Sequence, residues 1–247
     1  MKKVLASLAL AVSALALPAA AYANVVSTTI NFETIDTSFT MAAPFLVNGD
    51  EFYTPGINGR TMWFDPASNA PGAHLGDFVG SIITGACDGG LACPVNNPTT
   101  YIGMLDDGFL AIGSVEAGFT FSVKSLSASF IGEVDAQSSV PGFLALEGHR
   151  ASDGLSLTAY YALTGLDANG HLNFSTINTG AFGDYEFDVV FAYGYACKAG
   201  TCSAFTDNRA QFALDDIAIE HVPEPASLAL VGIAGLALVG ARRRRAA

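Results

Sequence analysis

The chain has 247 residues, four cysteines and a formal net charge of −12. Six of its eleven basic residues lie in the terminal segments, so residues 24–222 carry 5 basic against 22 acidic side chains, a net charge of −17. This charge excludes nucleic acid and anionic lipid as partners, and it favours cations, basic proteins or neutral glycans. Acidic residues that merely keep a secreted domain soluble are the simpler explanation.

The first 23 residues have the pattern of a secretory signal peptide. Lys2 and Lys3 form a basic start, Val4 to Leu17 form an apolar core, and Ala21-Tyr22-Ala23 is an A-x-A cleavage site. We therefore expect residues 1–23 to be a signal helix that is cleaved off. The remaining body, residues 24–222, is long enough for one all-β domain with a substantial core.

Throughout this body, short apolar or alternating runs recur between clusters of Gly, Asn, Asp and Pro, and helical periodicity is weak. The pattern is typical of a β-sandwich or barrel. The expected strands are, in chain order, 25–32, 45–47, 79–83, 101–105, 109–112, 119–124, 126–134, 143–147, 155–163, 171–177, 185–195 and 211–220. The stretch 58–77, rich in Asn, Pro and Gly, is expected to be a long structured loop with one strand at most.

Two of the expected strands indicate how the sandwich is arranged. Tyr185 to Tyr195 is the longest, and at ~3.3 Å per residue it would cross the whole sandwich, so we expect it to be central. The last strand changes its apolar parity at Asp215-Asp216, where a β-bulge would restore a single buried face. With first and last strands both well formed, the sequence predicts an antiparallel jelly-roll-like β-sandwich.

The four cysteines fall into two local pairs, Cys87 with Cys93 and Cys197 with Cys202. In an exported protein, an even number of closely spaced cysteines indicates disulfides that each close a short loop. Three connectivities are possible, and only proximity favours the local one. A zinc site is the alternative, but the C-x5-C and C-x4-C spacings differ from the tight C-x2-C pairs of such sites.

No catalytic residue is predicted, so we expect a protein that is not an enzyme. The histidines 74, 149, 171 and 221 are scattered, and neither G-x-S-x-G nor H-E-x-x-H occurs. Carboxylates are abundant, however, and a glycosidase pair can come from positions far apart in sequence. A secreted glycan hydrolase therefore remains the alternative.

Acidic residues near the two ends of the body suggest a cation site. Glu33 follows the first expected strand and Asp215-Asp216 lies in the last, and terminal strands of a jelly roll commonly lie side by side. Their hard oxygen atoms would suit Ca²⁺. Asn31-Phe32-Glu33 with Leu214-Asp215-Asp216-Ile217 resembles carbohydrate-binding β-sandwich modules, and this resemblance implies a structural calcium that ties the chain ends together. The alternative is a solvated acidic bulge with at least one carboxylate in water.

Aromatic residues give a second candidate surface. Trp63 and Tyr53 lie with Phe52 and Phe64 in the loop-rich region 50–77, where flat rings could stack on sugars while Asp and Asn accept hydrogen bonds from hydroxyls. We take Trp63 and Tyr53 as candidate ligand-binding residues. A core position for the single tryptophan is the competing interpretation.

The C-terminal segment contains three successive features. Pro223, Glu224 and Pro225 form a motif that cannot continue a strand or helix. The uncharged residues 226–241 would form a helix about 24 Å long at ~1.5 Å per residue, slightly short for the ~30 Å hydrocarbon core. Four arginines then follow and would hold the end on the cytoplasmic face: Arg242, Arg243, Arg244 and Arg245.

This order of motif, short apolar helix and arginine cluster resembles the PEP-CTERM sorting signal of Gram-negative bacteria. The resemblance implies anchoring of residues 223–247 in the cytoplasmic membrane, cleavage near the motif by an exosortase-type protease, and transfer of the body to the cell surface or extracellular matrix. It also implies association with exopolysaccharide and biofilm. We therefore expect a polysaccharide- or matrix-binding protein, with a plain membrane-anchored structural protein as a further alternative because an anchor would use the same apolar run.

Overall fold

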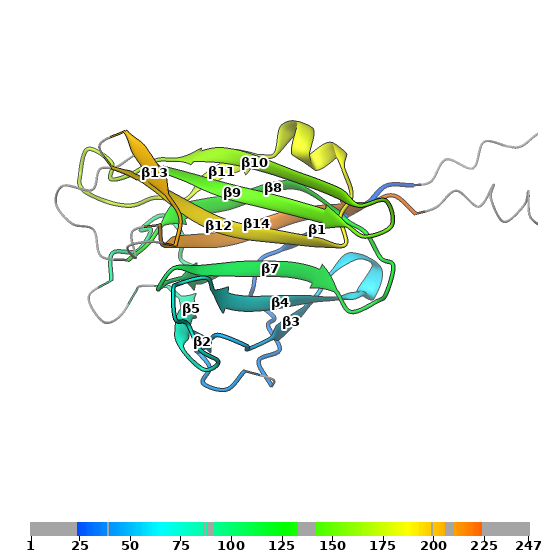
Figure 1. Cartoon of the computed structure of the whole chain (residues 1–247), viewed down its shortest axis with the longest axis horizontal. Coiled ribbons are helices and arrows are strands. Elements are labelled where there is room, and N and C mark those ends of the chain that lie inside the picture. The colour runs from blue at the N-terminus through cyan, green and yellow to red at the C-terminus, as the bar shows by residue number, and fades with distance from the viewer. Residues whose placement is uncertain are drawn as a thin grey trace, which may run out of the picture. The chain divides into compact units, whose positions relative to one another are not determined.

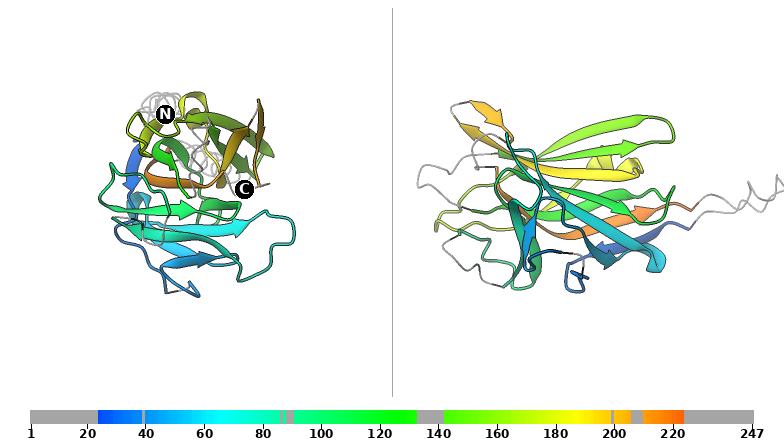
Figure 2. Two further views of the ribbon diagram at one scale, coloured as in Figure 1. Left: turned by 90° about the vertical axis from the view of Figure 1, so that its left-hand side faces the viewer. Right: turned by 60° about the horizontal axis from the view of Figure 1, so that its bottom comes forward.

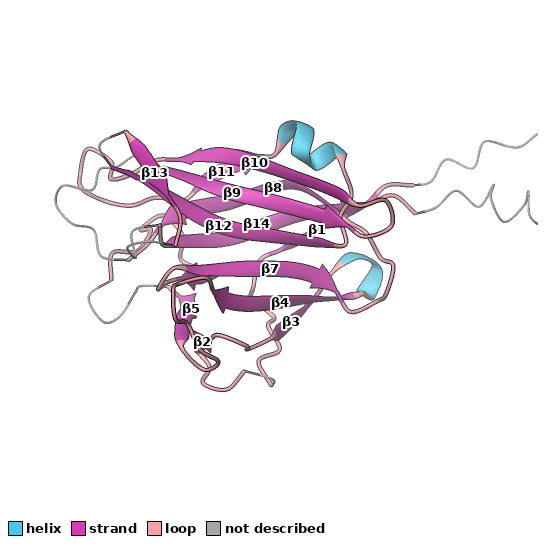
Figure 3. Cartoon of the chain, viewed as in Figure 1, coloured by secondary structure: helices cyan, strands magenta, loops and turns pink. Residues whose placement is uncertain are grey.

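Two antiparallel sheets make up the computed structural model, which describes residues 24–38, 40–85, 87, 91–132, 142–198, 200–205 and 210–223. Within this part of the chain, helix is limited to two short 3₁₀ turns, η1 (Ile57–Gly59) and η2 (Gly180–Asp184), as Figure 3 shows. The long strands run along the long axis of the sandwich (Figure 1). The all-β prediction is therefore confirmed for the described residues.

Sheet A contains seven strands. In spatial order its path is β11 (Ser175–Asn178), β8 (Ser122–Phe130), β14 (Phe212–His221), β6 (Thr100–Met104), β5 (Phe78–Thr84) and β2 (Phe45–Val47), and β1 (Val26–Ile30) also pairs with β14. Sheet B likewise contains seven strands. Its path is β10 (Leu155–Leu163), β9 (Gly142–Arg150), β12 (Val189–Lys198), β7 (Gly108–Ser114), β4 (Thr61–Ser68) and β3 (Phe52–Pro55), and β13 (Thr201–Ser203) also pairs with β12.

The core lies between the inner faces of the two sheets, where alternate residues of each strand meet. Phe52 and Phe64 stack with their ring centroids 5.0 Å apart, and Phe32 packs edge-on against Phe64 at 5.3 Å. All three side chains are buried. Phe52 and Phe64 are therefore core residues, unlike their neighbours Tyr53 and Trp63, which point to the other face of sheet B.

The first and last strands pair side by side, as expected. Val26 faces His221 and Ile30 faces Ile217, and the right view of Figure 2 shows that β1 begins where β14 ends, at one end of the sandwich. The register of β14 against β8 shifts between Asp215 and Ala218, which confirms the predicted bulge. Asp216 has a φ of +47°, a conformation that is uncommon for a residue with a side chain.

Several strands differ from the prediction. The expected strands 119–124 and 126–134 form one strand, β8, and β3 and β13 were not predicted. The region 58–77 does contain a single strand, β4, despite Pro66 within it. The proline is tolerated because β3 pairs with β4 only as far as Phe64, so that among the described strands the rest of β4 pairs with β7 alone.

Residues Val26–His221 form one compact unit. No helix within the described ranges is long and apolar enough to cross a membrane. The predicted signal helix at 1–23 and the predicted transmembrane helix after Pro225 lie outside the described residues, as do Glu224, Pro225 and Arg242 to Arg245. Of the predicted sorting motif, the structure describes Pro223.

Candidate ligand-binding face

The outer face of sheet B carries a set of aromatic side chains that no described segment buries completely. We call it the aromatic face and define it by Tyr53, Trp63, Phe109, Phe143, Tyr160, Phe191, Tyr193, Tyr195 and Phe205. Strand β12 supplies the central ridge because its residues alternate between partly exposed Phe or Tyr and buried Ala or Gly. Since strand residues alternate between faces, the small residues of β12 point to the core and its rings point outward.

Trp63 lies on this outer face, not in the core. Its ring lies against Gly113 of the neighbouring strand β7, where an added Cβ would come 2.3 Å from the ring. Its Nε1 donates a hydrogen bond to the backbone oxygen of Ser114 at 3.0 Å. Tyr53 is its cross-strand partner on β3, and the Tyr53 hydroxyl donates a hydrogen bond to Glu51. The structure thus places both predicted ligand-binding residues together on one partly exposed surface.

A hollow of about 380 Å³ opens in the middle of the aromatic face. It is lined by Asn69, Phe109, Glu147, Phe191, Tyr193, Tyr195 and Phe205. Phe205 closes one side, with its ring centroid 5.3 Å from Tyr193 and 6.3 Å from Phe109. Rings that meet at different angles around an open hollow offer apolar walls to a flat ligand.

A second hollow of about 360 Å³ adjoins the first and is lined by Phe143, Tyr160, Tyr195 and Cys202. Tyr195 lines both hollows, and Tyr160 packs edge-on against it with ring centroids 5.6 Å apart. Tyr160 is 57% exposed, the most accessible ring of the face. The two hollows therefore form one continuous surface with Tyr195 between them.

Glu147 is the polar centre of the first hollow. One of its oxygens, Oε1, lies 2.8 Å from Nε2 of His149, and the other, Oε2, accepts a hydrogen bond from the Tyr193 hydroxyl at 3.0 Å. Burial and the hydrogen bond to Glu147 raise the pKa of Tyr193, so its hydroxyl stays protonated and keeps donating. The Glu147 carboxylate is thus held in one orientation at the floor of the hollow.

Asp65 is a second carboxylate in the same row of the sheet. Strand pairing aligns Asp65 with Ala111, Ala111 with Phe191, and Phe191 with Glu147. Burial, with a smaller contribution from the neighbouring charge of Glu51, raises the pKa of Asp65 to about 6. Carboxylates therefore flank the aromatic ridge on both sides.

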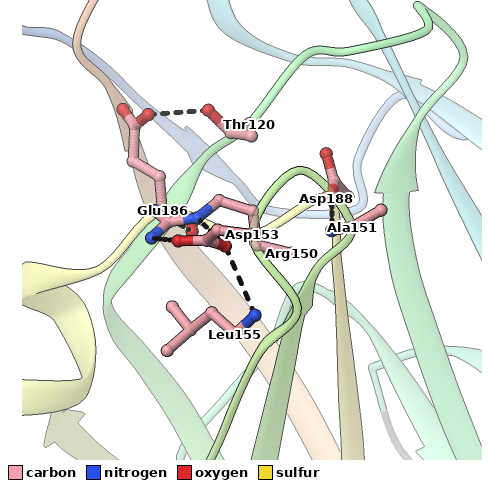
Figure 4. A network of polar contacts seen from close by, with 7 residues as sticks. All are labelled: Thr120, Arg150, Ala151, Asp153, Leu155, Glu186 and Asp188. Carbon is pink, nitrogen blue, oxygen red and sulfur yellow. Dashed lines mark hydrogen bonds and ion pairs between the residues drawn. The ribbon is translucent and has the colours of Figure 1, made fainter.

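A polar network fixes the ends of the strands that carry Glu147 and Phe191 (Figure 4). Arg150, at the end of β9, donates to both carboxylate oxygens of Asp153 and, at 3.1 Å, to the backbone oxygen of Glu186. Asp188 accepts a hydrogen bond from the backbone of Ala151. The turn after β9 is thereby tied to the segment before β12, which holds the register between these two strands.

The three predicted calcium ligands lie near the point where β14 changes partner from β6 to β1, with Asp215 and Asp216 on β14 and Glu33 shortly after β1. Asp215 is buried, and its Oδ2 accepts hydrogen bonds from Asn97 at 2.6 Å and from Thr99 at 3.3 Å. Glu33 is exposed and accepts a hydrogen bond from the backbone of Thr100 at 2.7 Å.

Asp216 is also exposed, so two of these carboxylates face water. Burial raises the pKa of Asp215, although its hydrogen bond from Asn97 acts in the opposite direction. Among the described residues, no three or more His, Cys, Asp or Glu side chains are grouped so that they could hold a metal. Calcium binding at Glu33, Asp215 and Asp216 stays a prediction.

The cysteines pair locally. Cys87 is bonded to Cys93 and Cys197 to Cys202, with Cα separations of 5.8 Å and 3.8 Å. The second pair joins opposite residues of β12 and β13. A zinc site built from all four cysteines is therefore wrong, because both pairs are already bonded.

Sequence reasoning named Trp63 and Tyr53 but missed the larger part of the aromatic face. The regular alternation of aromatic residues along 185–195 was the available signal, since it placed Phe191, Tyr193 and Tyr195 on one face of a strand. Glu147 and Phe205 carried no comparable signal because only the folded sheet brings them next to β12.

Comparison with known proteins identifies the tail. Residues 221–245 match the PEP-CTERM protein-sorting motif. This motif indicates an exported bacterial protein that is sorted at the cell envelope by an exosortase-type system and anchored in the membrane. No curated protein matches the chain.

Two crystal structures of DUF4465 family proteins are similar to this chain. The protein from Bacteroides caccae is 12% identical, with a TM-score of 0.48 over 78% of this chain and 98% of its own. The protein from Bacteroides ovatus is also 12% identical, with a TM-score of 0.36 over 80% of this chain and 100% of its own.

Proposed function

We propose that this protein is a cell-surface or extracellular-matrix protein of a Gram-negative bacterium whose aromatic face binds exopolysaccharide without cleaving it. The proposal depends on one observation above all, the extended set of partly exposed rings around the hollow at Glu147. The sorting motif at 221–245 supports the export part of the proposal, since it places the sandwich outside the cytoplasm where polysaccharide is present.

The chemistry of the face suits a sugar polymer. Aromatic rings offer flat apolar surfaces for the CH-rich faces of sugar rings, and the phenol hydroxyls, Asn69 and Glu147 can exchange hydrogen bonds with sugar hydroxyls. An aliphatic surface of equal area would lack both the flatness and the polar edges. A purely structural coat protein would have no use for these uncovered rings, because they make association and aggregation easier.

The spacing of Asp65 and Glu147 argues against hydrolysis by this pair of carboxylates. Asp65 and Glu147 lie three strands apart in one row, which at ~4.8 Å per strand separates their backbones by roughly 14 Å. Glycoside hydrolases hold their two carboxyl groups about 5 to 9.5 Å apart. The Glu147 carboxylate is also held by a tyrosine and a histidine and not by a second acid.

The test is binding of the full-length protein, purified in mild detergent, to a panel of insoluble and soluble polysaccharides, with release of reducing ends measured in parallel. We expect retention on at least one polysaccharide and no release of reducing ends. Tyr195→Ala should weaken binding on the order of tenfold, or ~1.4 kcal/mol, because this ring lines both hollows. Tyr185→Ala, which removes a 44% exposed ring outside the face, is the matched control and should leave binding unchanged.

Two results would contradict the proposal. Retention that Tyr195→Ala and Tyr160→Ala leave intact would place the binding surface elsewhere. Release of reducing ends that stops in Glu147→Gln would instead support the hydrolase alternative.

The sorting step has its own test. Deletion of residues 223–247 should release the protein from the cell envelope into the periplasm or medium, because the motif and the predicted membrane segment are removed together. Fractionation of cells that express the full-length and the shortened protein measures this. Unchanged attachment of the shortened protein would mean that another part of the chain holds it.

A further inference from the structure

We infer that the hollow at Glu147 selects glycans that carry free amino groups, such as polymers of glucosamine, over neutral and acidic glycans. This inference rests on the proposed function and adds the chemical class of the ligand. It combines three observations, namely the charge of the aromatic face, the position of Glu147, and the rings around that carboxylate.

The first observation is the sign of the charge. Glu51, Asp65 and Glu147 lie on or beside the aromatic face, and none of the described residues that line its two hollows is a lysine or an arginine. The whole body carries 5 basic against 22 acidic side chains. A glycan with uronic acids or sulfates would approach this surface against a repulsive field, whereas an aminoglycan would be attracted to it.

The second observation is that Glu147 is held in place but can still accept further hydrogen bonds. Its Oε1 faces His149 and its Oε2 accepts from Tyr193, yet a carboxylate can accept about four hydrogen bonds. Its side chain is 32% exposed and lines the hollow. An ammonium group that enters the hollow can therefore reach the carboxylate without displacing either existing partner.

The third observation is that the rings add attraction for a cation. Phe191 and Tyr193 line the same hollow as Glu147, and an ammonium group within about 6 Å of a ring centroid gains cation–π attraction. A hydroxyl or an acetamido group in the same place could still donate a hydrogen bond to the carboxylate, but it would lose the attraction between opposite charges and the cation–π attraction. The sugar ring would still stack, so neutral glycans would bind but more weakly.

Asp65 offers a second carboxylate, so a polymer with several amino groups should bind more tightly than a single amino sugar. Asp65 lies in the same row as Glu147, across Ala111 and Phe191, so that the two carboxylates flank the ridge. A glycan that crosses the strands can present one amino group to each carboxylate, since their backbones are roughly 14 Å apart at ~4.8 Å per strand. Two linked contacts raise the affinity for a polymer above that for a single sugar.

The experiment compares three oligosaccharides of the same length: a β-1,4-linked glucosamine hexamer, its fully N-acetylated counterpart and a hexamer of uronic acid. Polylysine is a fourth ligand, which tests binding of cations that carry no sugar rings. Affinities for the full-length protein in detergent are measured by titration calorimetry at low and at physiological salt. We expect the glucosamine hexamer to bind at least tenfold more tightly than the acetylated one. This ratio should fall as salt rises, because screening weakens the ion pairs.

Glu147→Gln is the informative variant, since an amide keeps the size of the side chain and can still accept from Tyr193. It should bring the affinity for the glucosamine hexamer close to that for the acetylated hexamer, whose own affinity should change much less. Asp184→Asn, on η2, is the control for removing one exposed acidic charge and should change neither. Thermal unfolding of each variant verifies that the fold is retained.

The outcomes separate this inference from the proposed function. Equal binding of the glucosamine and acetylated hexamers, with a salt-independent ratio near one, would overturn the amino-group preference and leave polysaccharide binding intact. Failure of every hexamer to bind would overturn both. Polylysine binding as tight as that of the glucosamine hexamer, and insensitive to Tyr195→Ala, would show a general cation surface and overturn the assignment to a glycan.

Discussion

The outer faces of the two sheets differ in how their apolar residues are covered. On sheet A, a second buried cluster of Ile83, Tyr101, Leu105, Ile131 and Ala213 lies under the loop that contains Cys87, Leu91 and Cys93, together with Phe174. On sheet B, the aromatic face remains partly exposed, and Tyr160 is 57% exposed. Sheet A thus carries a second small core on its outer face, and sheet B presents a surface.

The cover of sheet A is built from specific contacts. Phe174 packs edge-on against Tyr101 with centroids 5.2 Å apart, and Asn96 exchanges hydrogen bonds of 3.0 Å and 2.7 Å with the backbone of Phe174. Burial raises the pKa of Tyr101 to about 12. The comparison teaches that aromatic residues on an outer face contribute to stability where a loop covers them, and stay partly exposed where no described segment does.

The largest expected effect is on the free energy of unfolding when one tyrosine on each sheet is replaced. This pair of variants tests whether covered and open aromatic residues contribute differently to stability. Tyr101→Ala should lower the free energy of unfolding by about 4 kcal/mol, because it empties a fully buried site. Tyr160→Ala should change stability by less than about 0.5 kcal/mol and weaken glycan binding. Denaturant unfolding of both variants measures the difference, and similar losses of stability would break the distinction between a covered and an open face.

Removing each disulfide separately tests the same difference between the covered outer face of sheet A and the open aromatic face of sheet B. Replacing Cys87 and Cys93 by serine should cost about 2 kcal/mol, since each bond closes a short loop, and it should expose the small core of sheet A to a hydrophobic dye.

Replacing Cys197 and Cys202 by serine should cost a similar amount but alter ligand binding as well, because Cys202 lines the second hollow. Dye binding and glycan affinity together distinguish the two. Loss of glycan affinity in the Cys87 and Cys93 variant alone would contradict this assignment of roles.

The aromatic face should itself reduce stability at neutral pH through Asp65. The pKa of Asp65 is about 6 in the folded protein, above the ordinary value of ~3.9. At pH values between these two, the carboxyl group is therefore protonated in the folded state and ionised in the unfolded state. Stability is therefore highest below about pH 4 with respect to this group, and it falls as the pH rises through about 6.

Asp65→Asn should remove this dependence. It should stabilise the protein by about 1 kcal/mol at pH 7.5, well below what the full shift would give, because the carboxyl group is partly solvated. It should give no gain at pH 4. Unfolding curves across this range measure the effect, and an equal gain at both pH values would mean that ionisation of Asp65 is not its cause.

Features that follow from a local sequence pattern could be predicted, whereas features that depend on contacts between distant residues could not. Alternation within single strands predicted most strands, the length of the run 185–195 predicted the central place of β12, and the parity change at Asp215 predicted the bulge, because all three signals are local. Alternation does not say which face of a strand points inward when both faces are apolar. For β12 the small residues, not the rings, face the core.

The cover of sheet A was not predictable for a related reason. The contact of Phe174 with Tyr101 joins residues from distant parts of the chain, and no local pattern marks it. The pairing of Asp215 with Asn97 is of the same kind. Glu147 became a candidate only when the sheet placed it beside the rings of β12.

The calcium prediction concerns sheet A and has the smallest expected effect. Asp215 already accepts hydrogen bonds from Asn97, Thr99 and the backbone of Asp216, so a cation would gain little from it and would depend on the exposed Glu33 and Asp216. We expect millimolar calcium to raise the free energy of unfolding by less than about 1 kcal/mol, as for a weak site. Chelator should reverse the gain, and Asp216→Asn should abolish it.

A gain that persists in Asp216→Asn would place the cation elsewhere, and the absence of any gain in the unmodified protein would remove the site. A gain of several kcal/mol would instead mean that calcium displaces Asn97 from Asp215. In that case the stability of the covered sheet would depend on a metal as well as on its loop, and the two faces would differ in their response to calcium, which the aromatic face should lack.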